Sequence, residues 1–526
     1  MTADGESPSQ QEVGASNKAA DDIPSCDYLV ISAGATGMAF CDTLLHHASP
    51  SCSPSVVLVD KHTRPGGQWN DSYNFVALHQ PSKGYGVESE KLEPSGDPNA
   101  DTHRATRQEV LDYYSNVQRK LESQYNFRFD GSTWFDMDQL GGEGTTVKDG
   151  LYQLKSLSSD GTSSTSSSIR VHKKVVDARY LEPDLPVFVG PKFTFNNSAI
   201  RCIPVNELPM AVTSDKYYVV IGGGKTGMDA ITYLQTEASV DPTKITWVVP
   251  NDAWITAREN IGSCMEFLHT CAQLAKAESS DSAALKQAVL SKDFFQKGFL
   301  ELEKTGRVYR LNKDVLPTKF KDATLCKREM EIIQKVTNVI SHHGRVKSIS
   351  DNGDMNFEDG SVVSLPDGCS AADAIFVHCS AGAFNYSKHP NKSPPVYGDT
   401  SKILTIQDVY GTPGFCFVGS LFGKLEALGD KLSDADKNSM CLAPQADPLQ
   451  PVPPLGPTGG DIGAISKDHG LVQRVRNLEQ WLNVPEIKKW LEGHRLFNLG
   501  HLDGQQTVGV VEQIMEVLLE AGLVDV

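Results

Sequence analysis

Two short glycine-containing stretches of this chain have the residue types and spacing of phosphate-binding turns. The first follows the apolar run 29–31 and precedes helix-forming residues that start at Met38. This strand–turn–helix order lets backbone N–H groups at a helix N-terminus bind the pyrophosphate of a dinucleotide. Ser32 stands where the G-x-G-x-x-G pattern has its first glycine. The residues expected to bind a cofactor here are Ser32, Ala33, Gly34, Ala35, Thr36 and Gly37.

The second stretch contains all three glycines of that pattern. It follows the apolar run Tyr217–Ile221 and leads into a helical pattern that continues through Leu234. A Gly-Lys-Thr run also suggests an ATP-binding P-loop, but that motif needs a glycine at the position of Val219. A second motif about 190 residues after the first indicates two dinucleotide sites. The residues expected to bind a cofactor here are Gly222, Gly224, Lys225, Thr226 and Gly227.

An acidic residue ends the strand that is expected after the first turn. Asp60 directly follows the buried run Val56–Val59 and lies 23 positions after Gly37. A carboxylate at a spacing of about 20 residues accepts hydrogen bonds from the adenosine ribose. The alternative is a strand-end residue that caps the next turn. We expect Asp60, and Lys61 beside it, to contact the first cofactor.

The sequence leaves the nicotinamide coenzyme open. The strand expected after the second turn, Ile245–Val249, is followed by Pro250-Asn251-Asp252, and a carboxylate near a strand end favours NADH. Lys225 in the turn and Arg258 further along favour NADPH. A surface charge beside Glu259 is the alternative for Arg258. The residues therefore support NADPH and NADH about equally.

A glycine-rich loop, Arg64-Pro65-Gly66-Gly67-Gln68-Trp69, follows Asp60. The glycine turn, the acidic strand end and P-G-G-x-W together resemble the FAD-binding half of flavin-containing monooxygenases and their relatives. In that family the loop lies along the flavin, which implies cofactor contacts for Gly67, Gln68 and Trp69. The alternative from the residues alone is a Pro-Gly turn with an exposed tryptophan.

Two further segments follow the family pattern in part. The family usually has an asparagine near the flavin in the segment that corresponds to 74–83, and the counterparts here are His79 and Gln80. These two residues are the catalytic candidates, although a lone histidine is more often structural. The family's Phe-x-Gly-x-x-x-His signature corresponds to Phe188 through Thr194, with threonine in the place of histidine. The resemblance therefore holds at the level of the superfamily.

The resemblance covers roughly residues 25–430 and implies an α/β fold with two Rossmann-type dinucleotide-binding domains. The NAD(P)-binding domain is expected to be inserted in the FAD-binding domain. The expected division is a disordered tail at 1–24, the first part of the FAD-binding domain at 25–205, the NAD(P)-binding domain with a helical insert at 206–370, and the second part of the FAD-binding domain with C-terminal helices at 371–526.

Other segments are interpreted as core elements. The apolar stretch 414–420 resembles the family's last flavin-domain strand, which implies that Gly419 lies near the flavin; a simple core strand is the alternative. Helices are expected at 106–125, within 262–340, at 471–491 with a break at Pro485, and at 507–523. The apolar stripe of the last helix is expected to pack on the protein, and a homodimer face is its alternative.

Composition argues against several classes of partner. The net charge of −17, from 49 basic and 66 acidic residues, disfavours nucleic acid and anionic membrane surfaces. The sequence contains no run of about 18 apolar residues, so no membrane span is expected. The 11 cysteines lack zinc-ligand spacing, so no metal site is expected. Their apolar surroundings are typical of reduced thiols and predict a cytoplasmic protein.

The resemblance implies that NAD(P)H passes hydride to FAD, and it favours NADPH as the donor. The disulfide-reductase branch needs a cysteine pair beside the flavin, for which Cys264 and Cys271 are a poor substitute. O2 is then the expected acceptor, and reduced FAD would form a C4a-(hydro)peroxide that oxygenates a small-molecule substrate. The alternatives are a reductase or oxidase with another acceptor, and a non-catalytic FAD-binding redox sensor.

Overall fold

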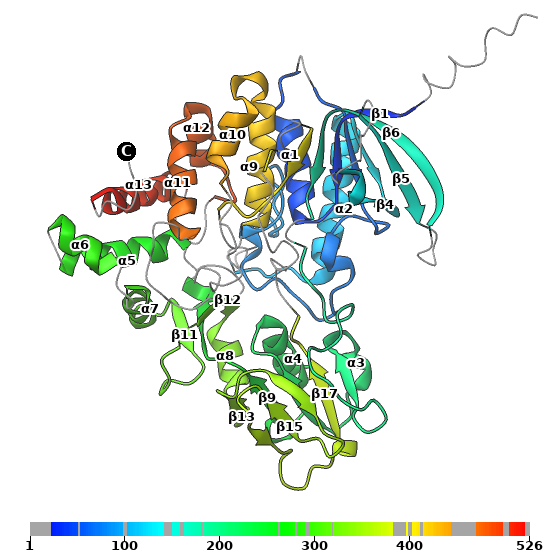
Figure 1. Ribbon diagram of the computed structural model, residues 1–526, viewed down its shortest axis with the longest axis vertical. Coiled ribbons are helices and arrows are strands. Elements are labelled where there is room, and N and C mark those ends of the chain that lie inside the picture. Colours follow the sequence, from blue (N-terminus) through cyan, green and yellow to red (C-terminus); the bar gives the residue numbers. More distant parts are fainter. Residues whose placement is uncertain are drawn as a thin grey trace, which may run out of the picture.

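A computed structural model of the protein contains two main β-sheets, near the top and the bottom of Figure 1, with helices between and beside them. Each main sheet is largely or entirely parallel, so the predicted α/β class is confirmed. The structure describes residues 23–50, 53–97, 102–140, 150–157, 163–179, 182–260, 264–278, 281–289, 294–317, 319–381, 396–397, 402–410, 414–442, 470–497 and 504–520. The predicted tail falls almost wholly outside these residues.

The first sheet has seven strands in the order β3-β2-β1-β6-β5-β4, and β18 also pairs with β6. Strands β3, β2, β1, β6 and β18 are parallel, whereas β4 and β5 are antiparallel additions. Apolar side chains cover both faces of the parallel part, as buried parallel strands require. The strands are β1 (Ser25–Ile31), β2 (Val56–Val59), β3 (Phe127–Asp130), β4 (Thr133–Phe135), β5 (Leu151–Leu157), β6 (Ser163–Asp177) and β18 (Ile403–Thr405).

Three helices, α1 (Ala35–His47), α2 (Arg107–Gln124) and α9 (Phe415–Ala427), lie beside this sheet (Figure 1). The prediction of α2 is confirmed together with its capping box. Thr106 Oγ1 accepts from the Glu109 N–H at 3.3 Å, and the Glu109 carboxylate accepts from the Thr106 N–H at 2.8 Å. These two bonds satisfy N–H groups that the first helical turn leaves without partners.

The predicted strand at 414–420 is wrong, because this stretch forms the first part of helix α9. A Cβ on Gly419 would lie 2.3 Å from the Thr36 carbonyl oxygen, and one on Gly423 would lie 2.6 Å from that of Phe40. Two glycines one helical turn apart therefore let α9 approach the backbone of α1 closely. A short continuous apolar run does not distinguish a buried strand from a buried helix, which explains the error.

The second sheet is entirely parallel, in the order β13-β9-β8-β17-β7. It extends beyond the predicted range 206–370 at both ends, since β7 and β17 pair with each other and β17 pairs with β8. In the chain its strands fall between β6 and β18, which pair in the first sheet. The elements are β7 (Cys202–Pro204), α3 (Leu208–Ala211), β8 (Tyr217–Ile221), α4 (Lys225–Thr236), β9 (Ile245–Val249), α8 (Lys327–Ile333), β13 (Asn338–Ser341) and β17 (Ala374–His378).

Two small sheets and three helices complete this part of the chain. The helices expected within 262–340 are present as α5, α6 and α7, together with α8. Strands β14, β15 and β16 form an antiparallel sheet, with Gly353 and Gly360 at positive φ in its turns. The elements are β10 (Ala253–Ala257), β11 (Val308–Arg310), β12 (Lys319–Leu325), α5 (Cys264–Glu278), α6 (Ser282–Val289), α7 (Phe294–Lys304), β14 (Val346–Ile349), β15 (Met355–Phe357) and β16 (Val362–Val363).

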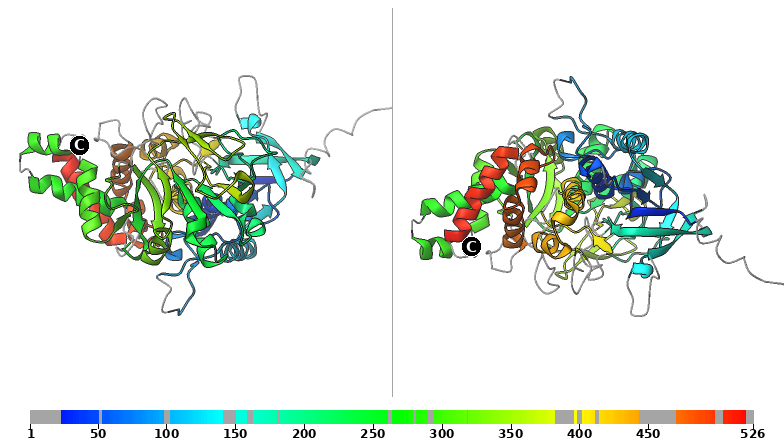
Figure 2. Two further views of the ribbon diagram at one scale, coloured as in Figure 1. Left: turned by 90° about the horizontal axis from the view of Figure 1, so that it is seen from below. Right: turned by 90° about the horizontal axis from the view of Figure 1, so that it is seen from above.

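The C-terminal helices connect the first sheet's core to this helical region. The predicted break at Pro485 is confirmed, since it separates α11 (Gly470–Leu482) from α12 (Pro485–Gly493). Helix α13 (Gly504–Glu520) lies along α5 in both views of Figure 2, where Lys276 forms ion pairs with Glu516 and Glu520. A short helix, α10 (Asp434–Met440), precedes them. The apolar stripe of α13 is thus buried within the chain, as expected.

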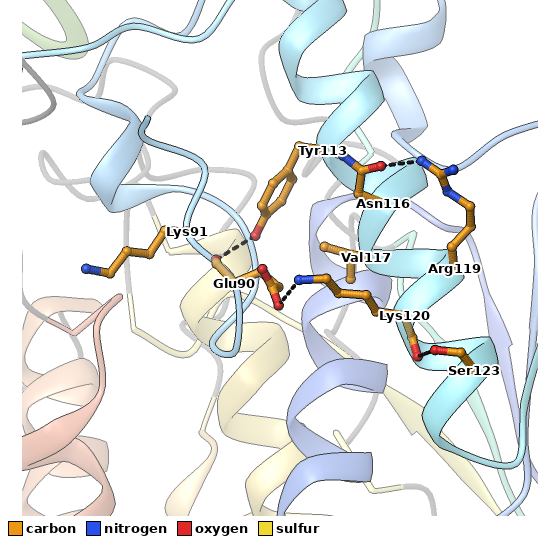
Figure 3. Close-up of a pocket in the computed structure, with 8 residues that line it drawn as sticks. All are labelled: Glu90, Lys91, Tyr113, Asn116, Val117, Arg119, Lys120 and Ser123. Atoms are coloured by element: carbon orange, nitrogen blue, oxygen red, sulfur yellow. Dashed lines mark hydrogen bonds and ion pairs between the residues drawn. The ribbon is translucent and has the colours of Figure 1, made fainter. Parts of the chain in front are cut away.

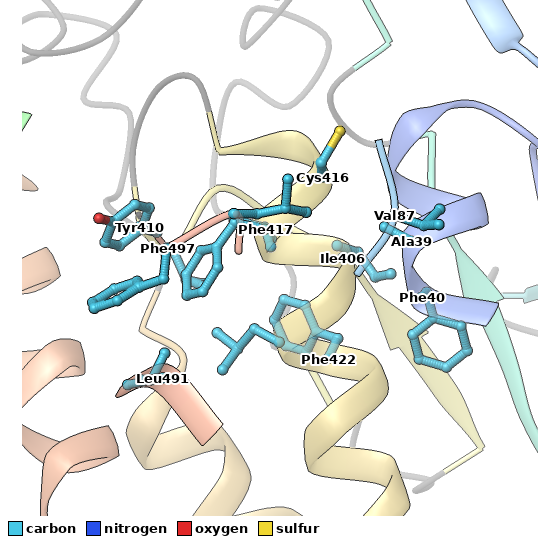
Figure 4. Close-up of a cluster of buried hydrophobic side chains, with 14 of the residues drawn as sticks. Ala39, Phe40, Val87, Ile406, Tyr410, Cys416, Phe417, Phe422, Leu491 and Phe497 are labelled. Atoms are coloured by element: carbon cyan, nitrogen blue, oxygen red, sulfur yellow. The ribbon is translucent and has the colours of Figure 1, made fainter. Parts of the chain in front are cut away.

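An aromatic core joins these helices to α9 (Figure 4). Phe417 stacks on Trp490 with ring centroids 6.1 Å apart and also contacts Phe497 and Tyr410. These aromatic rings pack against α9, the helix that also contacts the start of α1. The short 3-10 helices are η2 (Gly67–Asn70), η3 (Ser82–Gly84), η4 (Met137–Leu140), η6 (Val205–Glu207), η7 (Pro242–Lys244), η8 (Arg258–Asn260), η9 (Ala371–Asp373) and η11 (Gly429–Lys431).

Candidate functional site: two glycine turns and their junction

The first turn joins β1 to α1 and is closed tightly. A Cβ on Gly37 would lie 2.0 Å from the Ser32 carbonyl oxygen, so only glycine fits there. Ser32 adopts φ +85°, a left-handed conformation that glycine reaches more easily. Gly34 precedes α1, and Ala35 and Thr36 form its first turn. The predicted strand–turn–helix geometry is therefore present, and anion binding by the backbone N–H groups of this turn stays a prediction.

Asp60 lies at the end of β2 but is already engaged by the protein. Its Oδ2 accepts from the Ala33 N–H at 2.6 Å, and its Oδ1 accepts from the His62 N–H at 2.8 Å and lies 2.7 Å from His62 Nδ1. Burial disfavours the Asp60 carboxylate, yet the bonds from His62 keep its pKa below the ordinary value. The residue therefore ties the first turn to the strand end, as the capping alternative predicts.

His62 bridges two carboxylates, which the sequence alone did not reveal. Its second ring nitrogen lies 2.8 Å from Asp71 Oδ2. Burial disfavours its cation, but the hydrogen bonds to Asp60 and Asp71 outweigh burial and raise the pKa of His62 to about 9. The imidazole is thus a cation at neutral pH and fixes the loop that ends at Asp71. Its spacing of two residues from Asp60 was the only sequence signal.

The Pro-Gly-Gly loop lies against the first turn. Gly66 and Gly67 both have positive φ, and a Cβ on Gly67 would lie 2.7 Å from the Gly34 Cα. Trp69 is buried and donates its Nε1–H to the Tyr85 hydroxyl at 2.8 Å, so the exposed-tryptophan alternative is wrong. Gln68 is exposed beside it. Two glycines thus permit the close approach of loop and turn.

Lys61, the neighbour of Asp60, points to the surface. Its ammonium lies 3.2 Å from Glu182 Oε1 and 5.9 Å from the centre of the Phe188 ring. Phe188 is 65% exposed. Lys61 therefore lies beside the strand end where a ribose is expected, without a buried partner.

The second turn repeats the first. A Cβ on Gly227 would lie 2.1 Å from the Gly222 carbonyl oxygen, and Gly222 has φ +141°. Gly224 precedes α4, and a Cβ there would meet no atom within 4 Å. Thr226 and Lys225 form the first turn of α4. The space beside Gly224 is open, and the predicted contact of this turn with a cofactor stays a prediction.

The two cations proposed to recognise a 2′-phosphate are both paired with carboxylates. Lys225 forms an ion pair with Asp229, whose Oδ2 accepts from the Tyr73 hydroxyl at 2.7 Å. Arg258 is 9% exposed, so the surface-charge alternative is wrong. Its guanidinium lies 2.7 Å from Glu329 Oε2. Both cations therefore serve the junction of the two units.

The segment 73–80 of the first unit lies against α4 of the second. Phe75 stacks on Tyr233 with ring centroids 4.2 Å apart, and the His79 carbonyl accepts from Arg258 Nε at 2.7 Å. The predicted catalytic residues are thus brought beside the second turn. Burial, together with the Lys225 cation, lowers the pKa of His79 to about 4, so its imidazole is neutral at neutral pH.

Two buried atoms at this junction have no hydrogen-bond partner among the described residues, His79 Nδ1 and Gln80 Oε1. Buried polar atoms are normally satisfied, so these two atoms are open to a bound water or to a polar ligand. Glu329 holds the same junction together, because it pairs with both Arg104 and Arg258. Burial opposes its ionisation, but the cations of Lys225, Arg258 and Arg104 lower the pKa of Glu329 to about 2.

Gly419 lies on α9 and not at a strand end. It faces the Thr36 carbonyl of the first helical turn of α1. Its observed role is close helix packing behind the first turn, and its predicted contact with the flavin stays a prediction.

A surface hollow of about 440 Å³ occurs beside the C-terminal part of α2 (Figure 3). It is lined by charged and polar side chains, including Glu90, Lys120 and Arg119. Lys120 pairs with Glu90, and Arg119 bonds to Asn116. None of its lining residues belongs to either turn or to 73–80, so we place no chemistry there.

No family model matches the chain. Proteins of Mycobacterium tuberculosis and Mycobacterium bovis, described only as uncharacterized, are 29% identical over 485 residues, which covers 90% of this chain and 78% of theirs.

Solved structures of flavin monooxygenases are similar to this chain. The closed structure of cyclohexanone monooxygenase is 13% identical, covers 95% of this chain and 98% of its own, and has a TM-score of 0.45. OTEMO in complex with FAD and NADP is 15% identical, covers 77% and 84%, and has a TM-score of 0.46. Because these likenesses are distant, we base the function on the residues of this chain.

No helix among the described residues has the length and apolar character needed to cross a membrane. No group of three or more His, Cys, Asp or Glu side chains among them is arranged to hold a metal ion.

Proposed function

We propose that this protein is an FAD-dependent oxidoreductase that takes hydride from NAD(P)H. The first turn would hold FAD and the second the coenzyme, NADPH or NADH, in two Rossmann-type domains of which the second is inserted in the first. The observation that carries this proposal is the repeated turn: Gly37 and Gly227 each press against the carbonyl that opens their own turn. FAD, when bound, would supply the hydride acceptor.

The junction residues would position the two cofactors. Tyr73 and Phe75 attach the segment 73–80 to α4 through a hydrogen bond and a ring stack. The Arg258 contact with the His79 carbonyl fixes the end of the same segment. His79 Nδ1 and Gln80 Oε1 would then bind polar edges of the cofactors. A neutral imidazole with a pKa of about 4 is suited to hydrogen bonding and not to carrying a positive charge.

We further propose O2 as the electron acceptor and a small molecule as the compound oxygenated. A dithiol relay would need two reactive thiols together beside the first turn. Cys41 and Cys416 are both free and buried, and burial raises the pKa of Cys416 to about 11. They are therefore poor nucleophiles. An oxidase, a reductase with another acceptor and a non-catalytic FAD-binding sensor are the alternatives.

The test combines cofactor binding with reduction. Purified protein should retain FAD, and either NADH or NADPH should bleach the flavin absorbance without oxygen. Readmitted O2 should restore the colour with little H2O2 once a substrate is present; stoichiometric H2O2 with every candidate would indicate an oxidase. Protein that binds no FAD contradicts the proposal, and bound FAD that neither coenzyme reduces supports the sensor.

Gly224→Val separates the two turns. The added side chain would occupy the open space beside Gly224 where the coenzyme is proposed to bind. We therefore expect retained FAD and a loss of about 100-fold in the rate of flavin reduction. Gly190→Val is the matched control, because a Cβ at Gly190 also meets no atom within 4 Å. Loss of FAD from Gly224→Val but not from the control would show that the two roles are assigned wrongly.

A further inference from the structure

The loop after β9 carries an acidic side chain and no basic one before Arg258. Residues 250–257 contain neither lysine nor arginine, and Asp252 is 25 positions after Gly227. A carboxylate at about this spacing accepts hydrogen bonds from an adenosine ribose, whereas an arginine there accommodates a 2′-phosphate. The chemistry at this strand end is therefore that of a ribose site.

The Asp252 carboxylate lies beside a histidine with an unusual backbone conformation. Its Oδ2 lies 2.8 Å from His342 Nε2, and the Asp252 side chain is 13% exposed. His342 directly follows β13, which pairs in parallel with β9, so the two residues meet at the shared edge where both strands end. His342 adopts φ +69°, a conformation uncommon for a residue with a side chain. Such strain persists where the surroundings fix it and often marks functional positions.

The two cations that could attract a 2′-phosphate are committed elsewhere. Lys225 neutralises Asp229, and Arg258 neutralises Glu329, both within the buried junction. Turning Lys225 towards a phosphate would leave the Asp229 carboxylate without its cation, and turning Arg258 would leave Glu329 with Arg104 alone, so either movement is unfavourable. Arg345, three residues after His342, is exposed and is the cation that a competing NADPH site would use.

We infer that the second turn takes NADH in preference to NADPH, with Asp252 receiving the hydroxyls of the adenosine ribose. A 2′-phosphate would meet this carboxylate at close range, and like charges repel. The inference rests on the proposed function, since it assumes that the second turn holds the nicotinamide coenzyme.

The test measures binding without turnover. FAD-loaded protein is titrated with NAD⁺ and with NADP⁺ by calorimetry, and we expect NAD⁺ to bind at least about tenfold more tightly. Asp252→Asn should weaken NAD⁺ by about tenfold, and Asp252→Arg should reverse the preference. Asp215→Asn is the matched control, because it removes an exposed carboxylate just before β8, at the opposite end of the same sheet. Thermal melting shows whether each variant is folded.

The outcomes separate this inference from the proposed function. Tighter binding of NADP⁺, weakened by Arg345→Ala, together with reduction of the flavin by NADPH, overturns the inference and keeps the proposed function. Equal affinities that Asp252→Asn leaves unchanged also overturn it. If neither NAD⁺ nor NADP⁺ binds to protein that holds FAD, both the inference and the proposed function are overturned.

Discussion

The two glycine turns share a backbone and differ in their surroundings. Ser32 N–H donates to the Val59 carbonyl at 2.9 Å, and Gly222 N–H donates to that of Val248 at 3.1 Å. In each unit, the residue directly after a neighbouring strand bonds to the end of the strand that leads into the turn. Ala178, after β6, donates its N–H to the Ile31 carbonyl, and Cys379, after β17, donates its N–H to the Ile221 carbonyl. Yet Gly67 covers the first turn, whereas Gly224 in the second faces open space.

The comparison shows that two turns with the same backbone hydrogen bonds differ in the side chains and loops packed around them. In the first unit the strand-end carboxylate, Asp60, is buried under a cationic histidine and a loop. In the second, Asp252 pairs with His342, whose side chain is 55% exposed. The first turn also tolerates a serine at φ +85°, although a left-handed residue costs about 1–2 kcal/mol. The last glycine, Gly37 or Gly227, is present in both turns, and an added Cβ would lie about 2 Å from a carbonyl oxygen in each.

The largest expected effect therefore comes from adding one methyl group at that glycine. Gly37→Ala and Gly227→Ala would each place a Cβ about 2 Å from a carbonyl oxygen, so the turn must open. We expect each variant to lose its own nucleotide and to melt at a lower temperature, by an amount equivalent to about 3 kcal/mol or more. Melting curves and nucleotide titrations measure both effects.

Gly34→Ala and Gly224→Ala are the matched folding controls for this pair. A Cβ at Gly34 makes ordinary contacts at 3.6 Å, and one at Gly224 makes none. Both variants should melt close to the wild type. If Gly37→Ala melts like Gly34→Ala and keeps FAD, the two turns are not equivalent.

An intermediate effect is expected from the histidine that distinguishes the first unit. The folded pKa of His62, about 9, lies above its ordinary value of 6.5. The imidazolium therefore stabilises the fold fully below pH 6.5, and this contribution is lost as the pH rises through 9. Relative to His62→Gln, the wild type should lose on the order of 2–3 kcal/mol of unfolding free energy between pH 6.5 and 9.5.

His342→Gln is the counterpart in the second unit, where the histidine of the pair is 55% exposed. Urea unfolding of the wild type and His62→Gln at several pH values measures the first effect. At neutral pH, His342→Gln should change the free energy of unfolding by at most about 1 kcal/mol, because exposed pairs contribute little. A His62→Gln profile parallel to the wild type would contradict the buried bridge.

The smallest effect is expected at the position where the turns differ in sequence. Ser32→Gly relieves the left-handed serine, but glycine has more freedom in the unfolded chain, so the net gain should be at most about 1 kcal/mol. Gly222→Ser should instead destabilise, because its Cβ would lie 3.0 Å from the Cys379 backbone. Thermal melting compares them. Equal and opposite changes would show that the surroundings contribute nothing.

Patterns within short stretches of sequence predicted the fold well. Both turns, the capping box of Thr106 and Glu109, and the break at Pro485 follow from side-chain types a few residues apart. Such features depend on local geometry, so the sequence carries them completely. The apolar run 414–420 lacked any such feature, and its helix is decided by glycines that face α1.

The candidate site was predicted in its glycines and missed in its charges. By itself the sequence determined where the two glycine turns lie, because only glycine fits against the opening carbonyl of each turn. The tertiary structure alone decided that Arg258 pairs with Glu329, that Tyr73 bonds to Asp229 and that His62 joins Asp60 to Asp71. Charges act on whatever neighbour the fold supplies, often far away in the chain, and no local pattern encodes that neighbour.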